Sequence, residues 1–286
     1  MRNLTASIQT KLKQVAAAEE KSYQLILTRF FQERLLYRIF ISPYKSHFCL
    51  KGGALLYAFE KEASRPTMDI DLLGLRIDND LIHFKDVFLE ICQIEDATDA
   101  VTFNLDTLTT AKINKVDKYA GVRVKIEVKL GNIKQNLQID IGFGDVVTPN
   151  PIEMDYPTLL DMNAPKIQAY SIETLIAEKF EAMINLAEMN SRMKDFYDIY
   201  RLMLHKKYDL GILKQAIANT FERRKTDYVA NHPLFTSEFA ENDNRLVQWK
   251  SFLTKSTLDT TILFTDVIKI IKKELLPIYE SLNKEI

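Results

Sequence analysis

The chain has few of the residues that build disulfide frameworks and metal–thiolate sites. Its 286 residues include two cysteines, and no Cys-x-x-Cys motif or paired Cys/His spacing occurs. Neither a disulfide scaffold nor a zinc site is supported. The histidines also lack paired spacing, so we assign no catalytic role to any of the four. They are His47, His83, His205 and His232.

Long apolar runs and a strong charge of either sign are also missing. No apolar stretch approaches the roughly 20 residues of a membrane helix, and residues 1–5 lack the apolar segment of a signal peptide. We therefore expect a cytoplasmic protein with no membrane contact. The net charge is −1, and because a nucleic-acid binder needs a basic patch rather than a basic average, this value decides nothing about partners.

What the chain does have is enough apolar material for a substantial core. Hydrophobic residues make up 47% and charged residues 27%, and the length suits one large or two modest domains. The proline-rich span of residues 149–165 separates two patterns, with helices and strands before it and helices alone after it. We therefore predict one domain over residues 1–150 and a helical domain over residues 151–286.

The hydrophobic periodicity places the secondary structure along the chain. Helices are predicted over residues 11–41, ended by Pro43, and over residues 81–91, while residues 48–59 form a loop that leads into a short helix. Strands are predicted over residues 67–73, 101–105, 122–130 and 137–143. In the second half Ser171 is the expected N-cap of a helix. Further helices are predicted over residues 192–204, 212–221, 245–252 and 261–276.

Two aspartates stand close together in the apolar run of residues 67–73. Asp69 and Asp71 are two apart, so on a strand both side chains point to the same face. At 4 Å and an effective dielectric constant of about 20, two carboxylates repel by roughly 4 kcal/mol. Keeping these two carboxylates close together is therefore costly in free energy without a cation. The simpler alternative is that both aspartates are solvated on the exposed face of an edge strand.

A third carboxylate, Asp140, lies in the run of residues 137–143, on the strand face opposite the apolar side chains. If the two strands are neighbours, the three aspartates complete a metal cage for in-line phosphoryl chemistry. The simpler alternative is an exposed strand face. Asp145 is a lesser candidate, because Gly142, Gly144 and Asp145 also form a plausible turn.

A glycine pair precedes these aspartates. Gly52 and Gly53 follow Lys51 and open a short predicted helix, where backbone N–H groups can approach a phosphate. Most Gly-Gly pairs are simple turns. The pair indicates a phosphate site only because it stands before a predicted helix and upstream of the two aspartates. Thr67 adds a hydroxyl just before the aspartates.

A second group of charges lies in the helical half. Lys179 and Glu181 occupy one predicted helix, and Arg192, Lys194, Asp195 and Asp198 follow in the next. Surface ion pairs at i,i+3 and i,i+4 would explain this spacing. The aromatic residues Phe196, Tyr197 and Tyr200 are interleaved with these charges, which would allow stacking on a base.

Read together and in this order, the motifs resemble the AbiEii/AbiGii nucleotidyltransferase toxin family of the DNA polymerase β-like nucleotidyltransferase superfamily. The similarity spans roughly residues 48–201. It implies an α+β fold, a small mixed sheet flanked by helices, followed by a helical domain that completes the active-site cleft. It also implies an enzyme, a Mg2+-dependent nucleotidyltransferase.

The resemblance also implies roles for individual residues. Asp69, Asp71 and Asp140 would hold Mg2+, and Lys179 and Asp195 would join them as catalytic residues. The implied nucleotide-binding residues are Lys51, Gly52, Gly53, Thr67, Lys179, Arg192, Lys194 and Asp198. Two departures stand out, since the superfamily often has serine where this chain has Gly53, and arginine where it has Asn185.

The biology implied by the resemblance is a toxin of a toxin–antitoxin or abortive-infection system in phage defence. Its partners would be a nucleoside triphosphate, tRNA as acceptor and a separately encoded antitoxin. Two alternatives stay open, a nucleotide-binding partner protein without catalysis, and transfer to a protein or small molecule. Residues 223–225, Arg-Arg-Lys, favour RNA slightly, but they also suit a solvated helix end.

Overall fold

The structure, a computed structural model, describes residues 2–113, 121–205 and 207–284. The chain divides into two compact units, which are considered separately here. The first unit comprises residues 1–144 and 152–169, and the second comprises residues 145–151 and 170–286.

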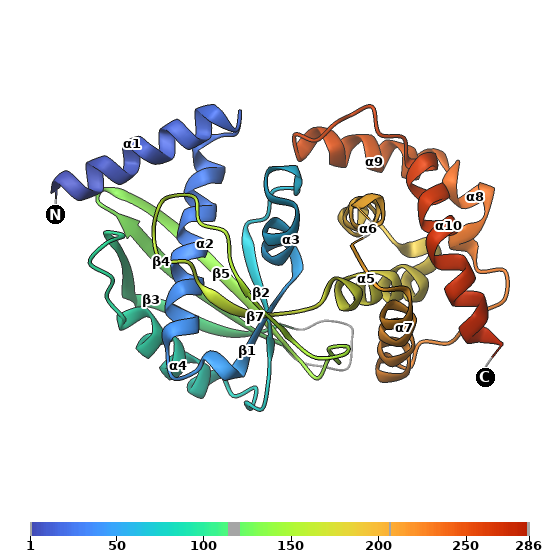
Figure 1. Cartoon of the computed structure of the whole chain (residues 1–286), viewed down its shortest axis with the longest axis horizontal. Coiled ribbons are helices and arrows are strands. Elements are labelled where there is room, and N and C mark those ends of the chain that lie inside the picture. Colours follow the sequence, from blue (N-terminus) through green and yellow to red (C-terminus); the bar gives the residue numbers. More distant parts are fainter. Residues whose placement is uncertain (1, 114–120, 206, 285–286) are drawn as a thin grey trace. The chain divides into compact units, whose positions relative to one another are not determined.

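The first unit is built on a mixed sheet of seven strands among the described residues, in the order β3-β4-β5-β2-β1-β7-β6 (Figure 1). β2 runs parallel to β5 and β1 parallel to β7, while the other neighbours are antiparallel. The strands are β1 (Phe48–Lys51), β2 (Asp69–Gly74), β3 (Val101–Ile113), β4 (Gly121–Leu130), β5 (Ile133–Phe143), β6 (Ile152–Asp155) and β7 (Lys166–Ala169). The predicted α+β class with a mixed sheet is confirmed.

Three of these strands have no counterpart in the sequence prediction. β1 lies where a loop was expected, and β6 and β7 follow Pro151, where only helices were expected. Each of the three has four residues, which is too short for a clear alternation of apolar and polar side chains. Pairing with neighbours distant in sequence, such as Leu50 with Ala169, defines them instead.

One face of the sheet is apolar and covered by helices. The even-numbered residues of β4 are buried, among them Val124 and Ile126, and so are Leu137, Ile139 and Ile141 of β5. Phe84 of α4 (Leu81–Gln93) packs its ring against Phe143 of this face. Because side chains alternate along a strand, Asp140 points to the opposite face.

Four helices accompany the sheet in the first unit. They are α1 (Arg2–Ala18), α2 (Tyr23–Ile41), α3 (Gly52–Glu60) and α4 (Leu81–Gln93). The single helical region predicted over residues 11–41 is two helices, separated by a turn in which Glu20 has a φ of 53°. Ser22 caps the second helix by accepting a hydrogen bond from the Leu25 N–H.

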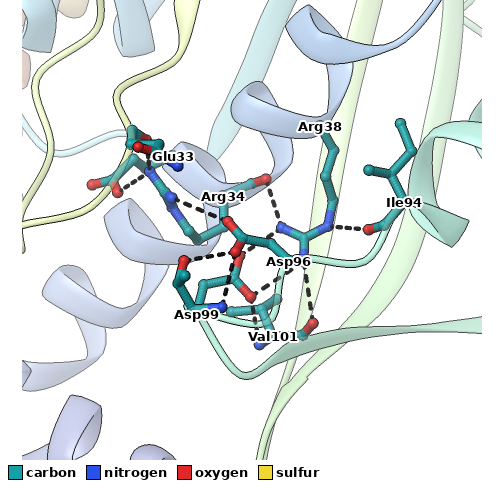
Figure 2. Close-up of polar contacts among 9 residues, drawn as sticks. Glu33, Arg34, Arg38, Ile94, Asp96, Asp99 and Val101 are labelled. Carbon is teal, nitrogen blue, oxygen red and sulfur yellow. Dashed lines mark hydrogen bonds and ion pairs between the residues drawn. The ribbon is translucent and has the colours of Figure 1, made fainter.

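Helix α2 buries charged side chains as well as apolar ones (Figure 2). Arg38 is 1% exposed and donates to both carboxylate oxygens of Asp99, at 2.7 and 3.2 Å, and to the Ile94 carbonyl at 2.8 Å. Burial raises the pKa of the nearby Glu33 to about 7, although Arg34 opposes the shift. The hydrophobic pattern of α2 did not reveal this network, because its partners lie more than 50 residues away.

The second unit is helical in its described residues. Its helices are α5 (Ile172–Leu186), α6 (Met193–His205), α7 (Leu210–Arg224), α8 (Ser237–Ala240), α9 (Asp243–Lys255) and α10 (Phe264–Asn283). Ser171 caps α5 as predicted, accepting from the Thr174 N–H. Phe180, Phe221 and Tyr279 form an aromatic core. No helix in the described part of the chain is both long and apolar enough to cross a membrane.

Candidate active site

Three carboxylates gather on the polar face of the sheet in the first unit. Asp71 of β2 and Asp140 of β5 are directly paired in the parallel ladder, and Asp69 lies two residues before Asp71 on the same face. One oxygen from each of the three lies within 4.8 Å of the others. The side chains are half-buried, so the repulsion expected from the sequence acts in a partly dehydrated place.

The donor set of this carboxylate cluster, defined as Asp69, Asp71 and Asp140, fits a hard divalent cation. Carboxylate oxygens are the ligands that Mg2+ prefers, and one or two carboxylates together with substrate phosphates are its usual environment in enzymes. Sequence spacing placed two of the three on one strand. The parallel pairing of β2 with β5 brings in the third.

Arg123, which the sequence reading missed, lies beside the carboxylate cluster. It is paired with Asp140 across the β4–β5 ladder and donates to both Asp140 oxygens, from Nε at 2.8 Å and from Nη2 at 2.7 Å. Its hydrogen bonds to Asp140 raise the pKa of Arg123, and the charges of Asp69 and Asp71 add to the effect. A register prediction for the β4–β5 hairpin would have found it, because residues 123 and 140 are cross-strand partners.

The glycine pair lies directly against these carboxylates. Gly52 has a φ of +65°, and a Cβ built on it would lie 2.0 Å from Oδ2 of Asp71. No other residue fits there without moving the carboxylate. Gly52 also opens α3, so the N–H groups of the first turn, which have no carbonyl partner within the helix, lie beside the carboxylate cluster.

The second glycine is explained by a neighbouring hydroxyl. A Cβ on Gly53 would lie 2.6 Å from Oγ1 of Thr67. That hydroxyl donates to Oδ1 of Asp69 at 3.0 Å. A serine at position 53, which the family resemblance leads us to expect, would therefore collide with Thr67. The hydroxyl next to Asp69 belongs to Thr67 instead. Lys51 is paired with Asp71 in the β1–β2 ladder.

The charges of the second unit form a separate buried cluster. The Lys179 ammonium donates to Oδ1 of Asp195 at 2.9 Å and to Oδ2 of Asp198 at 2.7 Å, and both aspartates are 2% exposed. Arg192 pairs with Asp195 at 2.9 Å and is about half exposed. We call Lys179, Arg192, Asp195 and Asp198 the lysine cluster.

The simpler explanation of this sequence pattern is correct for the i,i+3 pair of Arg192 with Asp195, and the buried pairs of Lys179 with Asp195 and Asp198 are added to it. Burial alone would raise the pKa of Asp195, but Lys179 and Arg192 overcome it and lower the pKa below its ordinary value. Lys194 is exposed. Phe196 and Tyr197 are buried against Phe264 and Trp249 and are therefore unavailable to stack on a base.

Arg224, predicted to lie in a basic surface triplet, is held by carboxylates. Its guanidinium pairs with Glu181 at 2.7 Å, Asp145 at 3.0 Å and Glu178 at 3.2 Å. Burial would lower the pKa of Arg224, but the three carboxylates together raise it. Asp145, the lesser candidate for the metal site, therefore has a partner in the second unit, and Arg224 contributes little to a basic patch.

The histidine with the fullest set of contacts has a structural role. His232 is 4% exposed, and its Nδ1 accepts from the Leu234 N–H while Nε2 lies 3.0 Å from the Ile184 carbonyl. The Leu234 contact places the proton on Nε2, which then donates to Ile184. Burial lowers the pKa of His232.

Comparison with known protein families gives a match over most of the chain. The model of the family described as "Nucleotidyl transferase AbiEii toxin, Type IV TA system" matches residues 34–268. No curated protein matches the chain. The matched residues 34–268 include both the carboxylate cluster and the lysine cluster.

Two solved structures from Helicobacter pylori are similar in fold. JHP933 has a TM-score of 0.51 at 14% identity, over 92% of this chain and 95% of that one. A candidate nucleotidyltransferase has a TM-score of 0.53 at 13% identity, over 93% of this chain and 99% of that one. At this identity the likeness concerns the fold alone.

Proposed function

Because the chain belongs to the AbiEii nucleotidyltransferase toxin family, we propose that it transfers a nucleotide from a nucleoside triphosphate to an acceptor hydroxyl. The observation that carries the proposal is the carboxylate cluster beside the N-terminus of α3. Its oxygens suit Mg2+, and the first-turn N–H groups suit phosphate oxygens. Both halves of a metal–triphosphate complex thus have matching groups.

Each residue of the first unit has a defined task in this proposal. Asp69, Asp71 and Asp140 hold Mg2+, which when bound neutralises charge on the phosphates and polarises the α-phosphate. Thr67 orients Asp69 through its hydroxyl, whereas Arg123 binds both oxygens of Asp140 and so competes with the metal for them. Gly52 and Gly53 leave the α3 N-terminus open to the triphosphate.

The reaction is an in-line substitution at the α-phosphorus. The acceptor oxygen forms a bond to this phosphorus while the bond to the oxygen bridging the α- and β-phosphates breaks. Pyrophosphate leaves with the electron pair, and the proton of the acceptor hydroxyl passes to water. The site's own contribution is positioning and electrostatic complementarity, which dominate phosphoryl-transfer catalysis.

We propose that the lysine cluster contributes to the same reaction. Lys179 donates to two buried aspartates, which fixes the position of its ammonium. Arg192 is about half exposed and is therefore the better phosphate contact of the two. Asp195 orients both cations, so its role is positioning.

The acceptor we propose is tRNA, and the biological role is that of a toxin in phage defence. The family description, a type IV toxin–antitoxin system, supports a separately encoded antitoxin as partner. The tRNA acceptor comes from the family resemblance. A nucleotide-binding protein without catalysis, and transfer to a protein or small molecule, are the alternatives that the test must separate.

The test is incubation of the protein with each of four α-labelled nucleoside triphosphates, Mg2+ and total cellular RNA. We expect label on a band of tRNA size with the wild type and with Asp86→Asn, an exposed control on α4. Asp71→Asn, and Asp69→Ala likewise, should give no label while keeping the far-UV circular dichroism of the wild type.

Other patterns of label would change the proposal. Label on protein or small molecules alone would mean that the acceptor is not tRNA, while the proposed nucleotide transfer stays unchanged. Label that persists in a folded Asp71→Asn variant would contradict the assignment of the carboxylate cluster. No label on any fraction, with nucleotide still bound, would favour the non-catalytic alternative.

A further inference from the structure

Arg123 is bound to the ligand atoms that β5 would contribute to a metal site. Its Nε donates to Oδ1 of Asp140 at 2.8 Å, and its Nη2 donates to Oδ2 at 2.7 Å. Gln138 donates to Oδ2 as well, at 3.4 Å. A metal that binds all three aspartates of the carboxylate cluster must therefore displace the guanidinium of Arg123 first.

This displacement makes the site a poor one for a metal that arrives alone. Bidentate pairs of a guanidinium with a carboxylate belong to the stronger class of charged hydrogen bonds. Mg2+ also gives up its water reluctantly, and in enzymes it is usually held by one or two carboxylates together with substrate phosphates. We therefore expect weak metal binding for as long as Arg123 holds Asp140.

The pair of Arg123 with Asp140 can open without a change in the fold. The two side chains are 37% and 17% exposed, whereas those of the Arg38–Asp99 pair on α2 are 1% and 0% exposed. Partly exposed ion pairs contribute little to stability. The ladder that joins β4 to β5 is made by backbone groups, so a turn of the Arg123 side chain leaves the ladder intact.

The α3 N-terminus and Arg123 flank the same carboxylates. One row of ladder partners crosses four strands, in the order Arg123, Asp140, Asp71 and Lys51. Neighbouring strands are roughly 4.8 Å apart, so the backbones of Arg123 and Asp71 lie about 10 Å apart. Gly52, the first residue of α3, lies directly against Asp71. Phosphates bound at the first turn of α3 are thus within reach of the long side chain of Arg123.

A triphosphate is a suitable anion to take Arg123 from Asp140. A guanidinium binds phosphate with the same paired N–H donors that it uses for a carboxylate. A triphosphate carries several negative charges, whereas Asp140 carries one. The exchange therefore keeps the hydrogen bonds of Arg123 satisfied and leaves both oxygens of Asp140 available to a metal.

We propose that Arg123 is a latch on Asp140 that the triphosphate releases, so that the site takes up its metal together with the triphosphate and not before it. The released guanidinium binds phosphate oxygens, and Asp140 joins Asp69 and Asp71 as a metal ligand. The proposal rests on the proposed function, since it takes the triphosphate group of the donor nucleotide as the releasing anion.

The variant that tests the latch is Arg123→Gln, which removes the charge and the paired donors together. Lys125→Gln is the matched control, because it removes a cation from the same face of the same strand at an exposed position. Neither residue is buried, so both variants should keep the far-UV circular dichroism of the wild type. The probe is inorganic triphosphate, which has no sugar or base.

The measurement is equilibrium dialysis of the full chain against Mn2+ alone, labelled triphosphate with EDTA, and the Mn2+–triphosphate complex. Chelation of Mn2+ by triphosphate in solution is the same for every protein and cancels in the comparison. We expect triphosphate to increase the affinity for Mn2+ about tenfold more in the wild type than in Arg123→Gln, because the variant has no latch to release.

The experiment with EDTA measures the contact between Arg123 and the phosphates. Triphosphate alone should bind to Arg123→Gln about tenfold more weakly than to the wild type, an effect typical of losing hydrogen bonds to a charged group. Lys125→Gln should resemble the wild type in all three dialysis experiments.

Three results would overturn the proposal. These are an equal coupling of Mn2+ and triphosphate in the wild type and Arg123→Gln, equal affinities of both for triphosphate in EDTA, and no binding of triphosphate to the wild type. The labelled-nucleotide transfer assay keeps these outcomes separate from failure of the proposed function. Asp71-dependent transfer with equal coupling would reject the latch alone. Coupling that depends on Arg123, without transfer to any acceptor, would reject the transfer alone.

Discussion

The two charged clusters of this chain differ in burial and in how their carboxylates are held. In the carboxylate cluster three half-buried aspartates lie together, and Arg123 donates to both oxygens of Asp140. In the lysine cluster, two aspartates face Lys179 and Arg192. Half-exposed carboxylates can take up a cation from solution, whereas buried ones that already accept from Lys179 and Arg192 are held in place by these cations.

The aspartates of the two clusters also differ in how deeply they are buried. Asp195 and Asp198 are 2% exposed, which is tolerable because each has a cation within hydrogen-bonding distance. The three aspartates of the carboxylate cluster are only half-buried. Their remaining access to water allows a metal and a substrate to approach.

The largest effect should come from unbalancing the lysine cluster. Lys179→Met would remove the cation that donates to both buried aspartates, Asp195 and Asp198, and removing one member of a buried pair typically costs about 3–5 kcal/mol. Urea denaturation should show this loss. Lys194→Met, an exposed control on α6, should change stability by less than about 0.5 kcal/mol.

The next effect concerns the glycines that keep the carboxylate cluster open. Gly53→Ser should destabilise the protein by about 1–3 kcal/mol, the usual cost of overpacking, because its Cβ would meet the Thr67 hydroxyl. Thr67→Ala in the same chain should recover part of that loss. Additive effects of the two changes in a double-mutant cycle would contradict the steric explanation.

A smaller effect should follow from removing the guanidinium of Arg123, which binds Asp140 of the carboxylate cluster. Arg123→Gln should tighten Mn2+ binding about tenfold, or about 1.4 kcal/mol, because Arg123 competes with a metal for both oxygens of Asp140. Lys125→Gln, an exposed control on the same strand, should change it much less. Weaker Mn2+ binding in Arg123→Gln would mean that Arg123 serves the metal by orienting Asp140.

The smallest effect is a pH dependence from Asp195. Its folded pKa is lower than its unfolded value of about 3.9, so the ionised group adds stability above that pH, and this contribution is lost as the pH falls through the folded pKa. Between about pH 5 and pH 3, the wild type should therefore lose stability faster than Asp195→Asn. The measurement is the free energy of unfolding from urea denaturation at each pH. Parallel pH dependences of the wild type and Asp195→Asn would contradict a lowered pKa of Asp195.

Much of the fold could be predicted from local patterns. The long strands of residues 122–130 and 137–143 and the helix capped by Ser171 carry strong signals, namely alternation and capping chemistry. Four-residue strands such as β1 do not, because they are defined by partners distant in the chain. The turn that divides residues 11–41 into two helices lacks proline and glycine, so no breaker marked it.

The candidate site could be predicted to a similar degree. Strand periodicity placed Asp69 and Asp71 on one face, and the ordered motifs added Asp140 and the glycines. Arg123 could not be found from a motif, because its position follows from hairpin register. The buried pairs of Lys179 were equally hidden, because its partners lie 16 and 19 residues away on another helix.

The most direct test of the central claim is Mn2+ binding to the carboxylate cluster, followed by electron paramagnetic resonance. Three proteins should be compared: the wild type, Asp71→Asn and the exposed control Asp86→Asn. We expect Mn2+ to bind to the wild type and the control and to bind much more weakly to Asp71→Asn. Equal binding by all three folded proteins would contradict the claim that this cluster is a metal site.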